Sequence, residues 1–420
     1  MTLNDDGSSP TRKTRSLGTQ AVALAAGTAL AQVIVAVLYI VTAREAGPEG
    51  YGQLVAAIAL GGSALGFFDF GTSAFWIRER ASGRMDLETF SARVTRKLVI
   101  AVAFFTLAMI FALIWLPQLV PSCAIFLAGT FTQTTMVPLR AARRGEVVAA
   151  LSIVERAAAV PIFTIALAVH ANPLQSLWVA LVVGTLTAGV AACLFSRSVG
   201  RANFRWRPGS NPWRGAKFYG LSALATSAQQ LDLPVLTAVA GPVASGIYGG
   251  VNRWTQPMGV LASAFSSASA PFIAHARDWK ATQRLVTRAA WLLVLAVCVC
   301  AGLAFAAPIL VSTLLGTEFA GSAHILQLLA VGTIPAIINQ PLAAALQARR
   351  YDHLVASVYL ASVVIQLGLV FSLGGTLGAL GAAIAFCVLQ VLMLLSLITC
   401  VTVAVRRDGH REKDLGNRNA

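Results

Sequence analysis

Two oppositely charged residues, Asp232 and Arg253, stand inside long apolar stretches and are the first candidates for chemistry. The segment from Gln229 to Pro257, QQLDLPVLTAVAGPVASGIYGGVNRWTQP, carries them on either side of a charge-free Gly-Pro turn. Each lies about eight residues from that turn, so at about 1.5 Å per residue both would sit about 12 Å deep in a membrane. A carboxylate and a guanidinium at that depth are costly, so we expect them to serve a function.

Two roles are open for this pair. In the first, Arg253 faces a central cavity and binds an anionic head group, while Asp232 orients it or takes a coupling cation. In the second, the two side chains form a buried structural ion pair between neighbouring helices. Gln229 and Gln230 precede the acid and are further candidates for substrate binding, and Pro234 follows it. Because proline removes a backbone hydrogen bond, we expect a helix break near Asp232.

A second charged pair, Glu155 and Arg156, lies in the apolar segment SIVERAAAVP. Adjacent residues on a helix point in different directions, so both cannot face one narrow groove. One arrangement places Arg156 in the cavity as a second head-group contact and Glu155 against a neighbouring helix, as a coupling or gating candidate. In the other, Arg156 extends toward the cytoplasm beside a local partner.

Asp69, in FFDFGTSAFWIRER, is a third coupling or gating candidate. It falls near the inner end of an expected membrane span. The residues around it favour a simpler role, in which Asp69 caps the cytoplasmic end of the helix and pairs with Arg78 or Arg80.

The sequence contains no recognised catalytic motif. The patterns GxxxxGK[ST], HExxH, GxSxG and DxD are all missing, and the six cysteines fall inside apolar runs without zinc-ligand spacing. We therefore expect no catalytic residues, no metal and no cofactor. Function should then depend on the polar residues within the membrane.

The composition is that of an integral membrane protein. Hydrophobic residues make up 57% of the 420 residues and charged residues only 12%, where a soluble domain carries about 25% charged residues. Charged clusters and Gly/Pro turns divide the chain into about twelve apolar segments, each long enough to cross a membrane as a helix. This pattern predicts an all-α protein with about twelve membrane spans. The expected spans are 18–41, 51–74, 96–116, 119–140, 147–169, 174–196, 217–240, 245–274, 286–308, 321–347, 354–373 and 376–404.

The positive charges locate the two sides of the membrane. The net charge is +15, and 29 of the 32 Lys and Arg residues fall in alternate segments, whereas the intervening segments hold only Arg44. This is the positive-inside pattern. It predicts a multi-pass protein of the cytoplasmic membrane with both termini cytoplasmic, and it explains the basic balance without nucleic acid as a partner.

Short similarities between the two halves predict an internal repeat. AGPEGYG, from Ala46, resembles AGPVASGIYGG, from Ala240, and LRAARRGE resembles LQARRYD. Two landmarks recurring in the same order indicate two six-helix lobes related by a pseudo-two-fold axis along the membrane normal. The expected organisation is a cytoplasmic basic tail, an N-terminal lobe, a basic cytoplasmic amphipathic linker, a C-terminal lobe and a cytoplasmic tail, at 1–17, 18–196, 197–216, 217–404 and 405–420.

Several of these segments resemble a known family. AREAGPEGYGQLVAAIAL followed by FFDFGTSAFWIRERASG is similar to the first two helices of Wzx-type polysaccharide flippases, of the multidrug/oligosaccharidyl-lipid/polysaccharide exporter superfamily. QQLDLPVLTAVAGPVASGIYGGVNRW looks like that family's seventh and eighth helices, with Asp232, Tyr248 and Arg253 at matching positions. LLGTEFAGSAHILQLLA with ALQARRYD is similar to its ninth-to-tenth-helix region.

The resemblance implies two six-helix lobes around a central cationic cavity. It also implies that the protein moves an undecaprenyl-diphosphate-linked glycan from the inner to the outer leaflet by alternating access. The expected function is therefore a flippase for a lipid-linked oligosaccharide in cell-surface polysaccharide biosynthesis, and not an enzyme. The expected partners are this glycolipid, anionic membrane lipids, and the glycosyltransferases and polymerase of the same pathway.

Two alternatives remain open from the residues. A multidrug/cation antiporter of the same superfamily is disfavoured because the first span offers Gln32 and Tyr39 but no acidic residue, where acidic coupling residues would be expected. An integral-membrane polysaccharide polymerase or glycosyltransferase is disfavoured because the outer loops are short and almost free of ionisable groups.

Overall fold

The computed structural model of the protein describes residues 17–200, 202–203, 206–207, 210–275, 290–349 and 351–418, and every regular element in these ranges is helical. The predicted basic tail, except residue 17, and the loop 276–288 lie outside them. The α-helices are α1 Leu17–Asp69, α2 Thr72–Ala81, α3 Leu87–Trp115, α4 Val120–Ala141, α5 Gly145–Ala168, α6 Pro173–Phe195, α7 Lys217–Gln229, α8 Asp232–His275, α10 Ala290–Leu314, α11 Ser322–Ala348, α12 Asp352–Leu377 and α13 Ala379–Arg418. The short 3₁₀ helices are η1 Pro117–Leu119, η2 Ser196–Val199 and η3 Thr317–Phe319.

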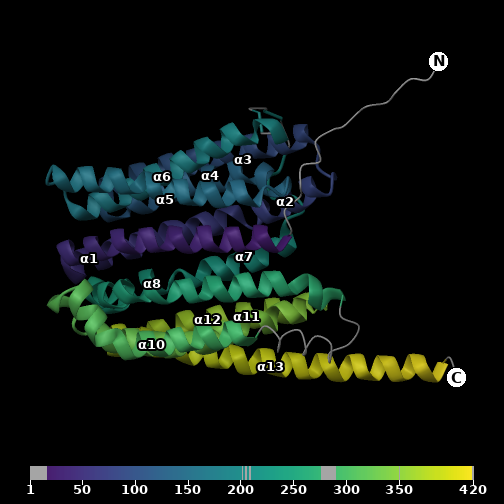
Figure 1. The fold of residues 1–420 in the computed structure, drawn as a ribbon. Helices are drawn as coiled ribbons and strands as arrows, with labels where there is room; N and C mark the ends of the chain where they lie inside the picture. Colours follow the sequence, from purple (N-terminus) through teal and green to yellow (C-terminus); the bar gives the residue numbers. More distant parts are fainter. Residues whose placement is uncertain are drawn as a thin grey trace, which may run out of the picture.

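The long helices lie side by side, and the two halves of the chain occupy opposite sides of the bundle (Figure 1). Helices α3 to α6 lie on one side and α10 to α13 on the other, with α1 and α8 in contact between them. Nine helices in the described part of the chain are long and apolar enough to cross a membrane.

Both central helices bend sharply at a Gly-Pro step. Gly47 in α1 has φ 69° and ψ 172°, and Gly241 in α8 has φ 83° and ψ 170°. This backbone region is essentially restricted to glycine, and each glycine is followed by a proline, Pro48 or Pro242. The two turns that match in sequence therefore also share one backbone conformation. We call the end of the bundle that holds them the glycine-turn end, and the opposite end, which holds the described residues between Ser196 and Lys217, the linker end.

Most of the other breaks between helices lie close to the expected ones. The breaks at η1 and between α5 and α6 lie within one residue of the expected gaps at 117–118 and 170–173, whereas the break at Gly378 between α12 and α13 falls just inside the expected span 376–404. The α3 helix begins earlier than expected, at Leu87, because the Asp86 carboxylate accepts a hydrogen bond of 3.0 Å from the Thr89 amide. Hydrogen bonds from Thr89 also lower the pKa of Asp86.

The backbones of α1 and α8 touch at the glycine-turn end. A Cβ atom added to Gly52 would overlap the carbonyl oxygen of Pro242, and one added to Gly246 would overlap that of Pro48. The two contacts are reciprocal, since each helix places a glycine against the proline of the other turn. Only glycine permits so close an approach.

The buried apolar residues are distributed unequally between the two ends. At the glycine-turn end, one cluster joins both halves of the chain and includes Tyr51, Phe163, Leu236 and Leu329. At the linker end, the buried clusters of the described residues each draw on one half, such as that of Leu139 and Leu151 and that of Leu346 and Leu397. The halves therefore share a core at the glycine-turn end, whereas at the linker end their buried cores are separate and α7 of the C-terminal half packs against α1 and α2.

Candidate functional site

The candidate site is built around a break between two helices. Helix α7 ends at Gln229 and α8 begins at Asp232, so the helix breaks where Pro234 predicted it. Pro234 occupies the first turn of α8, where backbone N–H groups have no partner within the helix. The Asp232 carboxylate accepts a hydrogen bond of 2.7 Å from the Leu233 amide, which satisfies one of these groups.

The bend in α8 brings a tyrosine onto the same carboxylate. The Tyr248 hydroxyl donates a hydrogen bond of 3.2 Å to the second oxygen of Asp232, and the two residues are 1% and 8% exposed. Tyr248 follows the turn at Gly241 and Asp232 precedes it, so this hydrogen bond closes the hairpin. Asp232 is thus a buried acid with neutral hydrogen-bond donors.

Arg253 packs against the other half of the molecule. Its guanidinium carbon lies 3.8 Å from the centre of the Tyr39 ring of α1, in a cation–π contact. Its Nε atom is buried without a hydrogen-bond partner. Among the ion pairs of the described residues, none joins Arg253 to Asp232, so the structural ion pair considered as one alternative is not formed. The guanidinium keeps capacity to bind an anion.

Aromatic rings extend from Arg253 toward the glycine-turn end. Tyr39 meets Tyr51 edge to face at 6.3 Å between ring centres, and Tyr51 meets Phe319 in the same way at 6.3 Å. Tyr51 and Phe319 are almost fully buried. These rings cover the arginine on that side.

The two glutamines have different environments. Gln229 is half-buried at the end of α7, whereas Gln230, in the break, is exposed. The Gln230 side-chain oxygen lies over Gly62 of α1, where a Cβ atom would clash with it. Both lie within four residues of Asp232, but no hydrogen bond in the described part of the chain joins either to Arg253.

Glu155 and Arg156 occupy a separate place on α5. The Thr185 hydroxyl of α6 donates a hydrogen bond of 2.9 Å to Glu155, so this acid faces a neighbouring helix. Arg156 lies 3.4 Å from the same carboxylate oxygen and its side chain is 28% exposed. Within the described residues, no hydrogen bond or ion pair connects this pair to Arg253.

Asp69 forms a different ion pair from the one expected. Its carboxylate accepts a hydrogen bond from Lys97 of α3, together with bonds of 3.0 Å from Thr72 and 2.6 Å from Ser73. Lys97 is 1% exposed and lies 5.0 Å from the centre of the Trp76 ring. The expectation of a partner in Arg78 or Arg80 is wrong.

Geometry explains this correction. Arg78 donates a hydrogen bond of 2.8 Å to the Tyr219 hydroxyl, and Arg80 packs over the Phe90 ring. Both extend from α2, which runs away from Asp69 after the corner at Gly71. The charge pattern places Lys97 among the positive charges expected on the cytoplasmic side. Its position directly before an uninterrupted apolar run was the available signal that it could be buried.

Comparison with known proteins places the chain in a family. The model of a family described as polysaccharide biosynthesis protein matches residues 17–277, which is more than half of the chain. The chain belongs to the polysaccharide biosynthesis protein family. The family resemblance of the helix motifs is therefore confirmed. No curated protein matches the sequence at a significant level.

Solved structures show that this family member has the fold of known membrane transporters. The lipid II flippase MurJ, in an inward closed conformation, matches with TM-score 0.74 and 12% identity over 91% of this chain and 87% of that one. An inward-facing multidrug resistance MATE family transporter of the MOP superfamily matches with TM-score 0.68 and 14% identity over 92% and 99%. An outward-facing MATE transporter matches with TM-score 0.63 and 14% identity over 92% and 96%.

Proposed function

We propose that the protein is a flippase that moves a polyprenyl-diphosphate-linked oligosaccharide from the inner to the outer leaflet of the cytoplasmic membrane. The product would serve cell-surface polysaccharide biosynthesis, and the protein itself would be a transporter without enzymatic activity. The observation that carries the proposal is Arg253, a cation without an acidic partner at the contact between the two halves, in a member of the polysaccharide biosynthesis protein family.

The helices support a twelve-span topology. Two of the nine candidate spans, Ala31–Asp69 and Tyr219–Thr255, contain the bends at Gly47 and Gly241, and each counts as two spans. With α4, which is outside the nine, the total is twelve. We assign the glycine-turn end to the outer surface and the linker end, with both termini, to the cytoplasm, because the arginines gather at the linker end. The lobes are 18–196 and 217–404.

The unequal cores support alternating access. The halves share buried apolar residues at the glycine-turn end and have separate cores at the linker end. A substrate would enter between the halves from the cytoplasmic side, and release outside would require the contacts around Gly52 and Gly246 to separate.

In this mechanism Arg253 binds the diphosphate of the lipid carrier. A guanidinium offers several N–H donors in a plane that matches phosphate oxygens. Asp232, held by Tyr248, orients the head group or takes a coupling cation, and Gln229 and Gln230 line the approach from the break in the helix. Arg156, half-exposed on α5, is a second contact for the anionic substrate.

The remaining assignments follow from this role. Glu155 and Asp69 are coupling or gating candidates in the N-terminal lobe. The expected partners are the lipid-linked glycan, anionic membrane lipids, and the glycosyltransferases and polymerase of the same pathway.

Translocation of a lipid-linked oligosaccharide in proteoliposomes tests the proposal. A lectin that cannot cross the membrane would measure how much glycan reaches the opposite leaflet. We expect Arg253→Ala to reduce the rate at least about tenfold, since a charge-assisted hydrogen bond contributes about 1.5–3 kcal/mol. The matched control is Arg44→Ala, an exposed arginine near the glycine-turn end. An unchanged rate in Arg253→Ala, at equal protein content, would contradict the assignment.

A multidrug/cation antiporter is the second candidate, because the buried acid Asp232 could bind a coupling cation and MATE transporters share the fold. Proton or sodium flux stimulated by a cationic drug, without any movement of glycolipid in the same vesicles, would favour the antiporter and overturn the flippase.

A further inference from the structure

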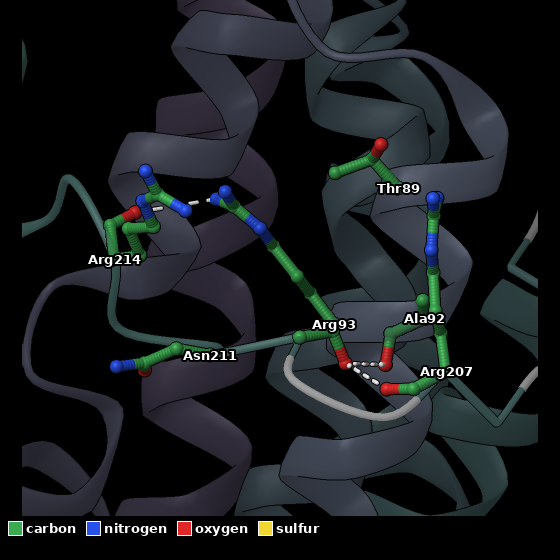
Figure 2. Close-up of a pocket in the computed structure, with 7 residues that line it drawn as sticks. Thr89, Ala92, Arg93, Arg207, Asn211 and Arg214 are labelled. Atoms are coloured by element: carbon green, nitrogen blue, oxygen red, sulfur yellow. Dashed lines mark hydrogen bonds between the residues drawn. The ribbon is translucent and has the colours of Figure 1, made fainter.

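A pocket of about 260 Å³ lies at the linker end, away from the Arg253 site. It lies between the first turns of α3 and the linker before α7 (Figure 2). Its lining residues are Thr89, Ala92, Arg93, Arg207, Ser210, Asn211 and Arg214.

Arginines of α3 hold the backbone of the linker beside the pocket, and Arg93 also lines it. Arg93 donates a hydrogen bond of 3.2 Å to the carbonyl oxygen of Arg214, and Arg96 donates one of 3.2 Å to that of Ser210. The linker is also anchored by Trp213, whose indole N–H donates a hydrogen bond of 2.9 Å to the Phe68 carbonyl oxygen. These hydrogen bonds therefore fix the linker backbone against α3 and α1 beside the pocket.

The pocket carries an excess of positive charge. Three guanidinium groups, those of Arg93, Arg207 and Arg214, line it (Figure 2). In the described part of the chain, the one ion pair made by these three is between Arg207 and Glu88, at 3.8 Å. That distance is too long for a hydrogen bond. The like charges of the three guanidinium groups repel one another, and a bound anion would reduce that repulsion.

A neutral donor completes the pocket. The Asn211 side-chain oxygen accepts a hydrogen bond of 2.9 Å from the Trp213 amide, which leaves the NH₂ group of Asn211 as a donor. The Thr89 hydroxyl also lines the pocket but is bonded to the Asp86 carboxylate. Guanidinium N–H groups together with a neutral amide match the oxygens of a phosphate group.

We propose that this pocket binds a phosphate group, either as the head group of an anionic phospholipid in the cytoplasmic leaflet or as a soluble phosphate. The site is separate from the transported substrate and does not depend on the proposed function. Because Arg214 lies three residues before α7 begins at Lys217, a phosphate bridging Arg93 and Arg214 fastens the start of the C-terminal half to α3.

Two binding measurements on the full chain test the site and identify the source of the phosphate. The first titrates inorganic phosphate into protein held in nanodiscs of zwitterionic phosphatidylcholine. The second uses native mass spectrometry to compare retained phosphatidylglycerol with phosphatidylcholine. The test variants are Arg93→Gln with Arg214→Gln, and Arg207→Gln alone, which retains the contacts of Arg93. The control is Arg143→Gln with Arg197→Gln, an exposed pair that removes the same charge.

We expect wild type to bind at least one probe, with affinity reduced at least about tenfold in the double variant, less in Arg207→Gln, and unchanged within about twofold in the control. Binding of inorganic phosphate identifies a soluble ligand, and selective retention of phosphatidylglycerol identifies a lipid head group. The proposal is overturned if wild type binds neither probe, or if the control loses as much affinity as the double variant.

Discussion

At the scale of single residues, the charged groups within the membrane differ in how their charge is compensated. Asp69 and Lys97 are buried and joined by a direct ion pair with hydroxyl donors around it. The Arg253 guanidinium instead packs against the Tyr39 ring, and its buried Nε–H group has no hydrogen-bond acceptor. In the Asp69–Lys97 pair each charge has its partner within the protein, which indicates a structural role. The Arg253 guanidinium can still bind an anionic ligand, which indicates a role in substrate binding.

We expect Lys97→Met to destabilise the protein strongly, because Asp69 would be left as an unpaired buried charge. Breaking a buried pair in this way costs about 3–5 kcal/mol. The double variant Lys97→Met with Asp69→Asn should recover most of that loss. Thermal unfolding in nanodiscs measures both. If the stable double variant also transports at the wild-type rate, Asp69 has no part in coupling; a loss of transport in that variant would restore it as a coupling residue.

A second prediction concerns the ring beneath Arg253. Tyr39→Phe retains the aromatic face and should transport normally, whereas Tyr39→Leu removes a cation–π contact of about 0.5–2 kcal/mol and should slow transport several-fold. The proteoliposome assay described above measures both variants, with protein content as the reference. Equal rates in the Phe and Leu variants would show that the ring does not position the guanidinium.

At the scale of elements, the reciprocal contacts of α1 and α8 determine whether the glycine-turn end can close. Gly246→Ala would place a methyl group against the Pro48 carbonyl oxygen, so the two helices must separate there. We expect faster hydrogen–deuterium exchange in residues 48–56 and 242–250, because the contact that protects them is weakened.

The matched control is Gly302→Ala in α10, where an added Cβ has no atom within 4 Å. Alanine favours a helix over glycine by about 1 kcal/mol, so this variant should exchange no faster than wild type. Faster exchange confined to Gly246→Ala supports the closed contact. Equal exchange in both variants would contradict it.

At the scale of the whole molecule, the two halves share one buried core at the glycine-turn end and have separate cores at the linker end. The bundle is therefore closed on the glycine-turn side.

The twelve-span topology predicts which side of the membrane each turn faces. In a variant without the six native cysteines, Glu49→Cys should react with an impermeant maleimide from outside the cell. Arg143→Cys should react only after the membrane is opened. Both positions are exposed, so equal labelling of both from outside would contradict the topology.

What the sequence determined by itself is local. Long apolar runs require helices in a membrane because every backbone N–H must find a partner within its own segment. The glycines at 47 and 241 permit bends that other residues resist, and Pro234 marks the start of α8. These signals act over a few residues, which is why the helices, their breaks and the family could be predicted.

The tertiary structure alone decided which side chains meet. Asp69 pairs with Lys97 from another helix, Arg253 packs on Tyr39 from the other half of the chain, and Arg93 meets the linker at Arg214. Such contacts depend on how each helix is rotated about its axis and how closely its neighbours approach. Hydrophobicity and charge counts do not specify that rotation, since it is set by the packing of all the helices together.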